Sequence, residues 1–147
     1  NFGGANNDQT WGAERAIDEN PSTAWSSNGD GNEAFIPVGL REPSSIIGIE
    51  VWTRFMANNT AQIFQFSVTT DPGSSDSETF GPFTLPDASK GYRFDVNSTR
   101  LAESIRLDVV DSSGGNTGLV EFKVFAAATV TATSTVSSDV FLPFSVR

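Results

Sequence analysis

Residues 16–25 read Ala16-Ile17-Asp18-Glu19-Asn20-Pro21-Ser22-Thr23-Ala24-Trp25 and form the most informative segment of this chain. It combines an acid, an amide, a proline and a hydroxyl in a loop that folds back and turns several oxygens inward. Inward oxygens suit a hard cation such as calcium, which takes about six to eight oxygen ligands. A second stretch, Gly118-Leu119-Val120-Glu121-Phe122-Lys123-Val124, places one carboxylate inside an apolar strand. Because a buried acid is costly without a positive partner, we expect the two stretches to form one cation site.

Length and charge exclude several classes of partner. The chain has 147 residues, enough for one domain, and it contains no cysteine. Its 9 basic and 18 acidic side chains give a net charge of −9, which disfavours binding to nucleic acid or to anionic lipid. No apolar run approaches the length of about 18 residues that a membrane helix needs, so we expect a soluble protein without a transmembrane segment. The first residue is Asn1 rather than methionine, from which we expect a processed or excised segment.

The absence of histidine argues against catalysis. It removes the usual general base, the Ser-His-Asp arrangement and imidazole ligation of zinc. A pair of carboxylates remains as a route to a glycosidase, and Asp108 and Asp111 are the acids to test for it. Other acids lie in turn or loop sequences such as Asp71-Pro72-Gly73, where they are usually solvated. We therefore predict that the chain is not an enzyme.

Apolar residues alternate with polar ones along most of the chain, which predicts strands with one buried face. Clusters of Gly, Pro, Asn, Asp and Ser separate the strands, as at residues 28–32 and 112–116. This punctuation predicts a β-sandwich or barrel with almost no helix. The sets expected to share one face are Ile36, Val38 and Leu40; Ile47, Ile49 and Val51; Phe64, Phe66 and Val68; Tyr92, Phe94 and Val96; Ile105, Leu107 and Val109; and Val120, Phe122 and Val124.

The two opening stretches resemble the discoidin family, which includes the C-type domains of coagulation factors and the galactose-binding-like modules attached to many bacterial glycosidases. The family begins Ala-x-Asp-Gly-Asn-x-x-Thr-x-Trp, and residues 16–25 match it except that Glu19 stands where glycine is usual. Residues 118–124 match the last strand of the family, and residues 49–54 and 66–71 resemble its middle strands. The resemblance covers roughly residues 10 to 126.

This resemblance implies an all-β fold, an antiparallel jelly-roll β-sandwich of about eight strands over residues 1–126, followed by a tail at residues 127–147. The tail alternates Thr and Ser with apolar residues over about eighteen positions, which exceeds an ordinary strand of about three to ten residues. It is a solvated linker, a hairpin on its own sandwich, or a strand added to a neighbouring copy. For strand addition we expect contacts from Val136, Val140, Leu142, Phe144 and Val146.

For the cation, the resemblance implies a structural calcium. Its ligands would be the side chains of Asp18, Thr23 and Glu121 and the carbonyl oxygens of Arg15, Asn20 and Val120. Such an ion ties the two ends of the fold together and performs no chemistry. The alternative is that Asp18 and Thr23 only cap a turn through nearby backbone groups.

The resemblance also implies that sugar is held by loops at one end of the sandwich. The matching candidates are Trp11, Arg54, Phe55, Asn58, Asn59 and Asn116. Two alternatives remain: Asn59 and Asn116 are ordinary turn residues, or Phe55 and the adjacent methionine act as a membrane spike, which the charge disfavours. Asn58 and Asn97 begin acceptor sequons for N-glycosylation, and a glycan on Asn58 would cover the sugar site.

These interpretations predict a non-catalytic extracellular module that acts in adhesion by binding cell-surface or matrix glycans, stabilised by calcium. The alternative is a self-assembling subunit of an extracellular filament or surface layer, in which the C-terminal strand docks onto a neighbouring copy. The expected partners are therefore glycans, with copies of the chain itself as the second possibility.

Overall fold

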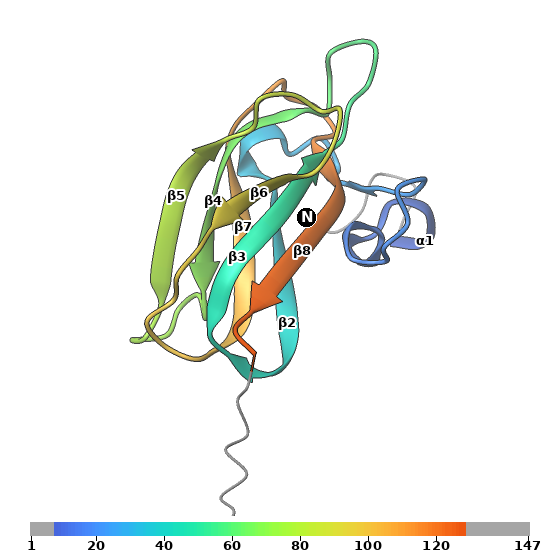
Figure 1. Cartoon of the computed structure of the whole chain (residues 1–147). Coiled ribbons are helices and arrows are strands. Elements are labelled where there is room, and N and C mark those ends of the chain that lie inside the picture. The colour runs from blue at the N-terminus through green and yellow to red at the C-terminus, as the bar shows by residue number, and fades with distance from the viewer. Residues whose placement is uncertain (1–7, 129–147) are drawn as a thin grey trace, which may run out of the picture.

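The computed structural model describes residues 8–128. Two four-stranded sheets pack face to face, with strand orders β1-β8-β3-β6 and β2-β7-β4-β5 (Figure 1). All paired strands in this range run antiparallel. The strands are β1 (Trp25–Ser26), β2 (Phe35–Ser44), β3 (Ile46–Thr53), β4 (Ile63–Thr70), β5 (Glu78–Thr84), β6 (Tyr92–Asp95), β7 (Ala102–Ser112) and β8 (Gly118–Ala126), and the short helical elements are α1 (Asp8–Trp11), η1 (Ala13–Ala16) and η2 (Gly31–Glu33). The predicted all-β antiparallel sandwich of about eight strands is confirmed.

The core fills the space between the two sheets. Trp25 and Phe66 are its largest fully buried side chains, and the Phe66 ring packs against Phe83 and Phe94 at centroid distances of 5.4 and 5.3 Å. At the edge of the first sheet, a Cβ on Gly118 would overlap the carbonyl oxygen of Trp25. Strands β1 and β8 therefore approach each other only because residue 118 is glycine, and this contact joins the two ends of the domain.

The predicted orientation of the Ile47 and Phe64 side chains is wrong, because each lies beside a β-bulge. Both side chains were expected to share a face with buried neighbours, but they are 40% and 36% exposed, whereas Ile46 and Ile63 are fully buried. The strand register shifts next to these positions in β3 and β4. An extra residue in one strand reverses the alternation of the side chains beyond it, so the neighbouring isoleucine takes the core position.

The strand directions place four connecting loops at one end of the sandwich, at residues 27–34, 54–62, 85–91 and 113–117. Loop 54–62 joins β3 to β4 and projects furthest from this end in the view of Figure 1. The described chain leaves β8 at the opposite end. We call the first of these ends the loop end.

Both edge strands of the second sheet, β2 and β5, carry prolines. Strand β2 contains Pro37 and Pro43, and strand β5 contains Pro82. Proline has no N–H to donate to a neighbouring strand, so it blunts an edge against the addition of another chain.

Candidate functional site

The loop between η1 and β1 gathers three oxygens around one hydroxyl. The Thr23 Oγ1 lies 2.9 and 2.7 Å from the two carboxylate oxygens of Asp18 and 2.9 Å from the carbonyl oxygen of Asn20. A hydroxyl has one proton to donate, and an ionised carboxylate and a carbonyl have none. The Thr23 hydroxyl therefore donates to only one of them, but the Asn20 N–H donates to Asp18 Oδ1 and the Thr23 N–H donates to the Asn20 carbonyl, each at 3.0 Å, so every oxygen has a donor within the loop. The same oxygens are hard donors of the kind that could also face a cation.

The backbone of this loop also shows the turn capping that was the alternative interpretation. The Asn20 N–H donates to Asp18 Oδ1 at 3.0 Å, and the Arg15 guanidinium lies 3.6 Å from Asp18. Burial raises the pKa of Asp18, but the hydrogen bonds from Thr23 and Asn20 and the charge of Arg15 outweigh it and hold the pKa below its ordinary value. Glu19 has φ of +57°, a left-handed conformation that glycine adopts without strain.

Glu121 on β8 is a buried acid without a hydrogen-bond partner. Its residue is 3% exposed, and neither carboxylate oxygen accepts a hydrogen bond. Burial raises its pKa; the charge of Asp18 acts in the same direction, while Lys123 and the nearby N–H groups of Asn20 and Glu19 lower it by less. Those N–H groups approach the carboxylate without reaching hydrogen-bond geometry. An unpaired buried carboxylate is costly, which points to a positive ligand.

The donor set suits calcium. Across residues 8–128, no three His, Cys, Asp or Glu side chains cluster in a way that could hold a metal ion. The oxygens that this loop and β8 could offer are the carboxylates of Asp18 and Glu121, the Thr23 hydroxyl and main-chain carbonyls. Hard oxygen donors of this kind are typical of calcium rather than of zinc or softer metals. Arg15 and Val120 lie in the chain segments next to Asp18 and Glu121; Val120 is partly exposed, and Leu119 takes the fully buried position.

Three of the predicted sugar-binding residues come together, but they contact one another. The Arg54 guanidinium lies 4.5 Å above the centre of the Trp11 ring, and its Nη1 donates to Ser26 Oγ at 2.8 Å and to the Asn116 carbonyl at 3.0 Å. Burial lowers the pKa of Arg54. Arg54 therefore connects α1, β1 and the 113–117 loop, and its contacts hold these three segments in place.

The other three predicted residues lie on loop 54–62. Phe55 is 56% exposed. Asn59 has φ of +57°, a turn conformation that the alternative interpretation expected for it. Asn58 lies in the same turn, where its Oδ1 accepts hydrogen bonds from the N–H and the hydroxyl of Thr60. These two asparagines shape the loop that presents Phe55.

A hollow of about 310 Å³ beside Phe55 contains residues that the sequence analysis missed. It is lined by Phe55, Gln62, Asp87, Ala88 and Ser89. An exposed aromatic ring next to an amide, a carboxylate and a hydroxyl is a combination that can bind a sugar ring and orient its hydroxyl groups. The only local signal for Asp87, Ala88 and Ser89 was the turn sequence at residues 86–91. Nothing in that sequence connects these three residues to Phe55.

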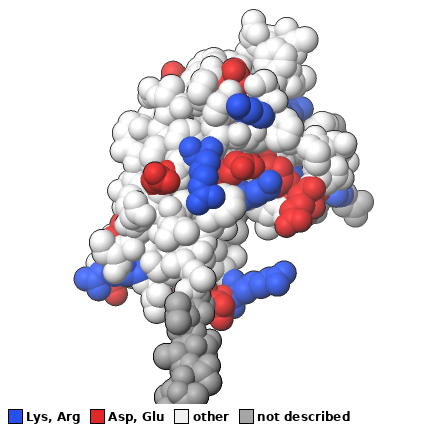
Figure 2. Space-filling model, in the orientation of Figure 1, with Lys and Arg blue, Asp and Glu red and all other residues white. Residues whose placement is uncertain are grey.

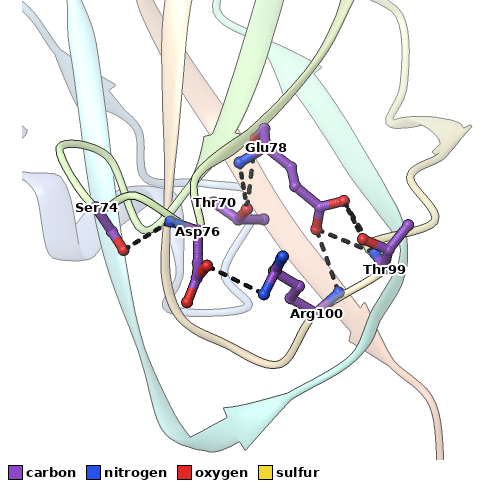
Figure 3. A network of polar contacts seen from close by, with 6 residues as sticks. All are labelled: Thr70, Ser74, Asp76, Glu78, Thr99 and Arg100. Atoms are coloured by element: carbon purple, nitrogen blue, oxygen red, sulfur yellow. Dashed lines mark hydrogen bonds and ion pairs between the residues drawn. The ribbon is translucent and has the colours of Figure 1, made fainter.

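The opposite end of the sandwich is held by a polar network (Figure 3). Glu78 accepts hydrogen bonds from the N–H and the hydroxyl of Thr99 and from the N–H of Arg100, and Arg100 also lies 3.0 Å from Asp76. The hydrogen bonds from Thr99 lower the pKa of Glu78. Asn97 of the second sequon is exposed nearby, but the Thr99 hydroxyl of that sequon is engaged by Glu78. This network connects β5 to the loop before β7.

Charges of both signs are interspersed on the face shown in Figure 2. Lys123 pairs with Glu50 at 3.2 Å, and the Arg93 guanidinium lies 4.1 Å above the Phe125 ring. This face of the described residues therefore has no continuous basic patch of the kind that attracts nucleic acid.

Two of the predictions from the sequence concern the membrane and the tail. Within residues 8–128, no helix has the length and apolar character needed to cross a membrane. The predicted assembly contacts Val136, Val140, Leu142, Phe144 and Val146 lie outside the described residues.

Solved structures with the same fold include carbohydrate-binding modules. The family 32 module of NanJ from Clostridium perfringens, in complex with galactose, is 21% identical with a TM-score of 0.64, and the match covers 80% of this chain and 86% of that one. The family 32 module of AlyQ, in complex with 4,5-unsaturated mannuronic acid, is 24% identical with a TM-score of 0.63, covering 82% and 89%. A family 89 glycoside hydrolase from Clostridium perfringens is 23% identical with a TM-score of 0.66; the match covers 86% of this chain but 14% of the hydrolase.

The family assignment depends on the sequence as well as on the fold. The comparison with curated proteins finds no match. The model of the F5/8 type C domain, however, matches residues 3–122, which include the 16–25 loop and most of β8. The resemblance to the discoidin family is thereby confirmed, and this chain belongs to the F5/8 type C domain family.

Proposed function

We propose that this chain is a non-catalytic glycan-binding module of an extracellular protein, acting in adhesion, with its sugar site at the loop end. The observation that carries the proposal is the hollow beside Phe55, because it combines an exposed ring with polar atoms that are available to a ligand. Among residues 8–128, the Gln62 side chain has no hydrogen-bond partner, and all the hydrogen bonds to Asp87 go to its Oδ1, so Oδ2 accepts none.

Sugar rings present one apolar face of C–H groups and an edge of hydroxyl groups. An aromatic side chain packs against the apolar face, and amide and carboxylate groups fix the hydroxyls. Phe55, Gln62 and Asp87 line the same hollow of about 310 Å³ and can supply these two functions. The modules of NanJ and AlyQ, solved with a galactose and an unsaturated mannuronic acid, support a ligand of this size and class.

A structural calcium belongs to the same proposal. The side chains of Asp18, Thr23 and Glu121 would hold it, together with the carbonyl oxygens of Arg15, Asn20 and Val120. When bound, it would supply positive charge to the Glu121 carboxylate, which has no hydrogen-bond partner among residues 8–128, and would offset the repulsion between Glu121 and Asp18. It would thereby connect the η1–β1 loop to β8 and stabilise the domain.

Self-assembly through the C-terminal segment remains a prediction with less support. Its predicted contacts lie outside the described residues, and the prolines in β2 and β5 disfavour strand addition at those two edges. No contact among residues 8–128 favours it over glycan binding.

A Phe55→Ala substitution tests the sugar site. The wild-type protein should be retarded in affinity electrophoresis through gels that contain a galactose-bearing polysaccharide, and the variant should bind between about twofold and tenfold more weakly, since an aromatic stacking contact contributes about 0.5–1.5 kcal/mol. The Leu101→Ala variant is the matched control, because Leu101 is 66% exposed at the opposite end of the sandwich. Equal retardation of Phe55→Ala and the wild type would exclude this hollow, and failure of the wild type to bind any member of a broad glycan array would overturn the proposed function.

A further inference from the structure

We propose that Asp87 makes the loop-end hollow selective for uncharged sugars over sugars that carry a carboxylate. This inference rests on the proposed function and specifies the class of glycan that the same site accepts. It concerns a residue that the sequence analysis did not select, and it decides between the two kinds of sugar, galactose and an unsaturated uronic acid, that the structural neighbours hold.

Asp87 is held in a fixed orientation. Its Oδ1 accepts hydrogen bonds from the Ser89 N–H at 2.8 Å, the Ser89 hydroxyl at 2.6 Å and the Tyr92 hydroxyl at 2.8 Å. Three donors on one oxygen orient the carboxylate and leave Oδ2 as an acceptor for a ligand hydroxyl. The same hydrogen bonds, from Ser89 first and then from Tyr92, hold the pKa of Asp87 below its ordinary value, so the group stays ionised in mild acid.

The loop that carries Asp87 is anchored to the sheet behind it. The Trp52 indole N–H donates to the carbonyl oxygen of Ala88 at 2.9 Å, and Trp52 belongs to β3, whose end leads into the loop that presents Phe55. The two walls of the hollow are therefore connected through one strand. A site arranged in this way before binding loses little conformational entropy when the ligand enters.

The hollow contains one charged group, and it is negative. Among its lining residues, only Asp87 carries a charge. The nearest cationic residues in the sequence do not line the hollow. The Lys90 ammonium lies 5.3 Å from the centre of the Tyr92 ring, and its charge is the smallest of the causes that lower the pKa of Asp87; the Arg54 guanidinium stacks on Trp11. A carboxylate on a bound sugar would thus meet the Asp87 charge with only a weak attraction from Lys90, and the net charge of −9 adds to the repulsion.

The size of this effect follows from the Coulomb energy of two like charges. At a separation of about 4 Å in a well-hydrated site the repulsion weakens binding by about fivefold. Because the site is open to solvent, the discrimination should shrink as salt is added. An uncharged ligand of the same shape would show neither effect.

The experiment compares galacturonic acid with its methyl ester, which has the same ring and hydroxyls but no charge, and uses galactose as a second uncharged probe. Dissociation constants are measured by NMR titration at low and at high salt for the wild type, for Asp87→Asn and for the control Asp95→Asn. Asparagine keeps an oxygen to accept the Ser89 and Tyr92 hydrogen bonds, so Asp87→Asn removes the charge and preserves the loop. Asp95 is exposed on β6, away from the hollow.

We expect the wild type and Asp95→Asn to bind the ester and galactose at least about fivefold more tightly than the free acid, and Asp87→Asn to lose most of that difference. If the wild type binds the acid as tightly as the ester, the inference is overturned while the proposed function stands. If it binds neither the ester nor galactose, the proposed sugar site fails and the inference fails with it.

Discussion

A Glu121→Gln substitution should change the stability of this domain in opposite directions with and without calcium. Without a cation, the wild-type carboxylate is a charge on a residue that is 3% exposed, and neither of its oxygens has a hydrogen-bond partner. Leaving such a charge uncompensated costs about 3–5 kcal/mol, while an unsatisfied buried amide costs about 1–3 kcal/mol. In excess chelator the variant should therefore be more stable than the wild type, by about 2 kcal/mol.

Calcium should reverse this order. An ion that binds only the folded state at a concentration of 100 times its Kd stabilises the domain by about 2.7 kcal/mol. For a domain of this size, this corresponds to a rise in Tm on the order of 10 °C. The variant loses one of the two charged ligands of the site, so it should gain much less from the ion. The wild type should then be the more stable protein in calcium.

Thermal unfolding of both proteins in excess calcium and in excess chelator, followed by differential scanning calorimetry, measures all four Tm values. The control is Glu103→Gln, an exposed glutamate at the opposite end of the sandwich, which should respond to calcium as the wild type does. The reasoning is refuted if the wild-type Tm is the same in calcium and in chelator, or if the Glu121→Gln protein gains as much from calcium as the wild type.

Two further predictions concern the same loop and strand. In chelator, the wild type should become more stable as the pH falls from 7 towards 5. The pKa of Glu121 in the folded state is raised above 4.5, so the folded protein binds a proton before the unfolded chain does. Midpoints of chemical denaturation measure this trend, and Glu121→Gln should abolish it. Glu19→Gly should raise the urea midpoint by the equivalent of about 0.5–1 kcal/mol, since residue 19 has φ of +57° and glycine adopts that conformation without strain. An unchanged or lower midpoint would mean that the Glu19 side chain itself stabilises the loop.

Much of the fold could be predicted from local pattern. Alternation of apolar residues is a property of the strand itself, because successive side chains point to opposite faces, and it placed Ile105, Leu107 and Val109 on the buried face of β7 correctly. The 16–25 loop is equally local, since Asp18 and Thr23 contact each other across one turn. Glu121 stood out because an acid in an apolar strand requires a partner.

The strands and the oxygen-rich loop could therefore be read from the chain, because they depend on residues close together in it, and the resemblance to the discoidin family supplied the antiparallel sandwich. The outward orientation of Ile47 and Phe64 appears only in the folded protein, because a bulge depends on how two strands pair. The same holds for the hollow shared by Phe55 and Asp87, which lie on loops that meet only because β3, β4, β5 and β6 run in alternating directions and bring these loops to one end of the sandwich. Contacts between distant segments have no local signature, and they are where the proposed recognition site lies.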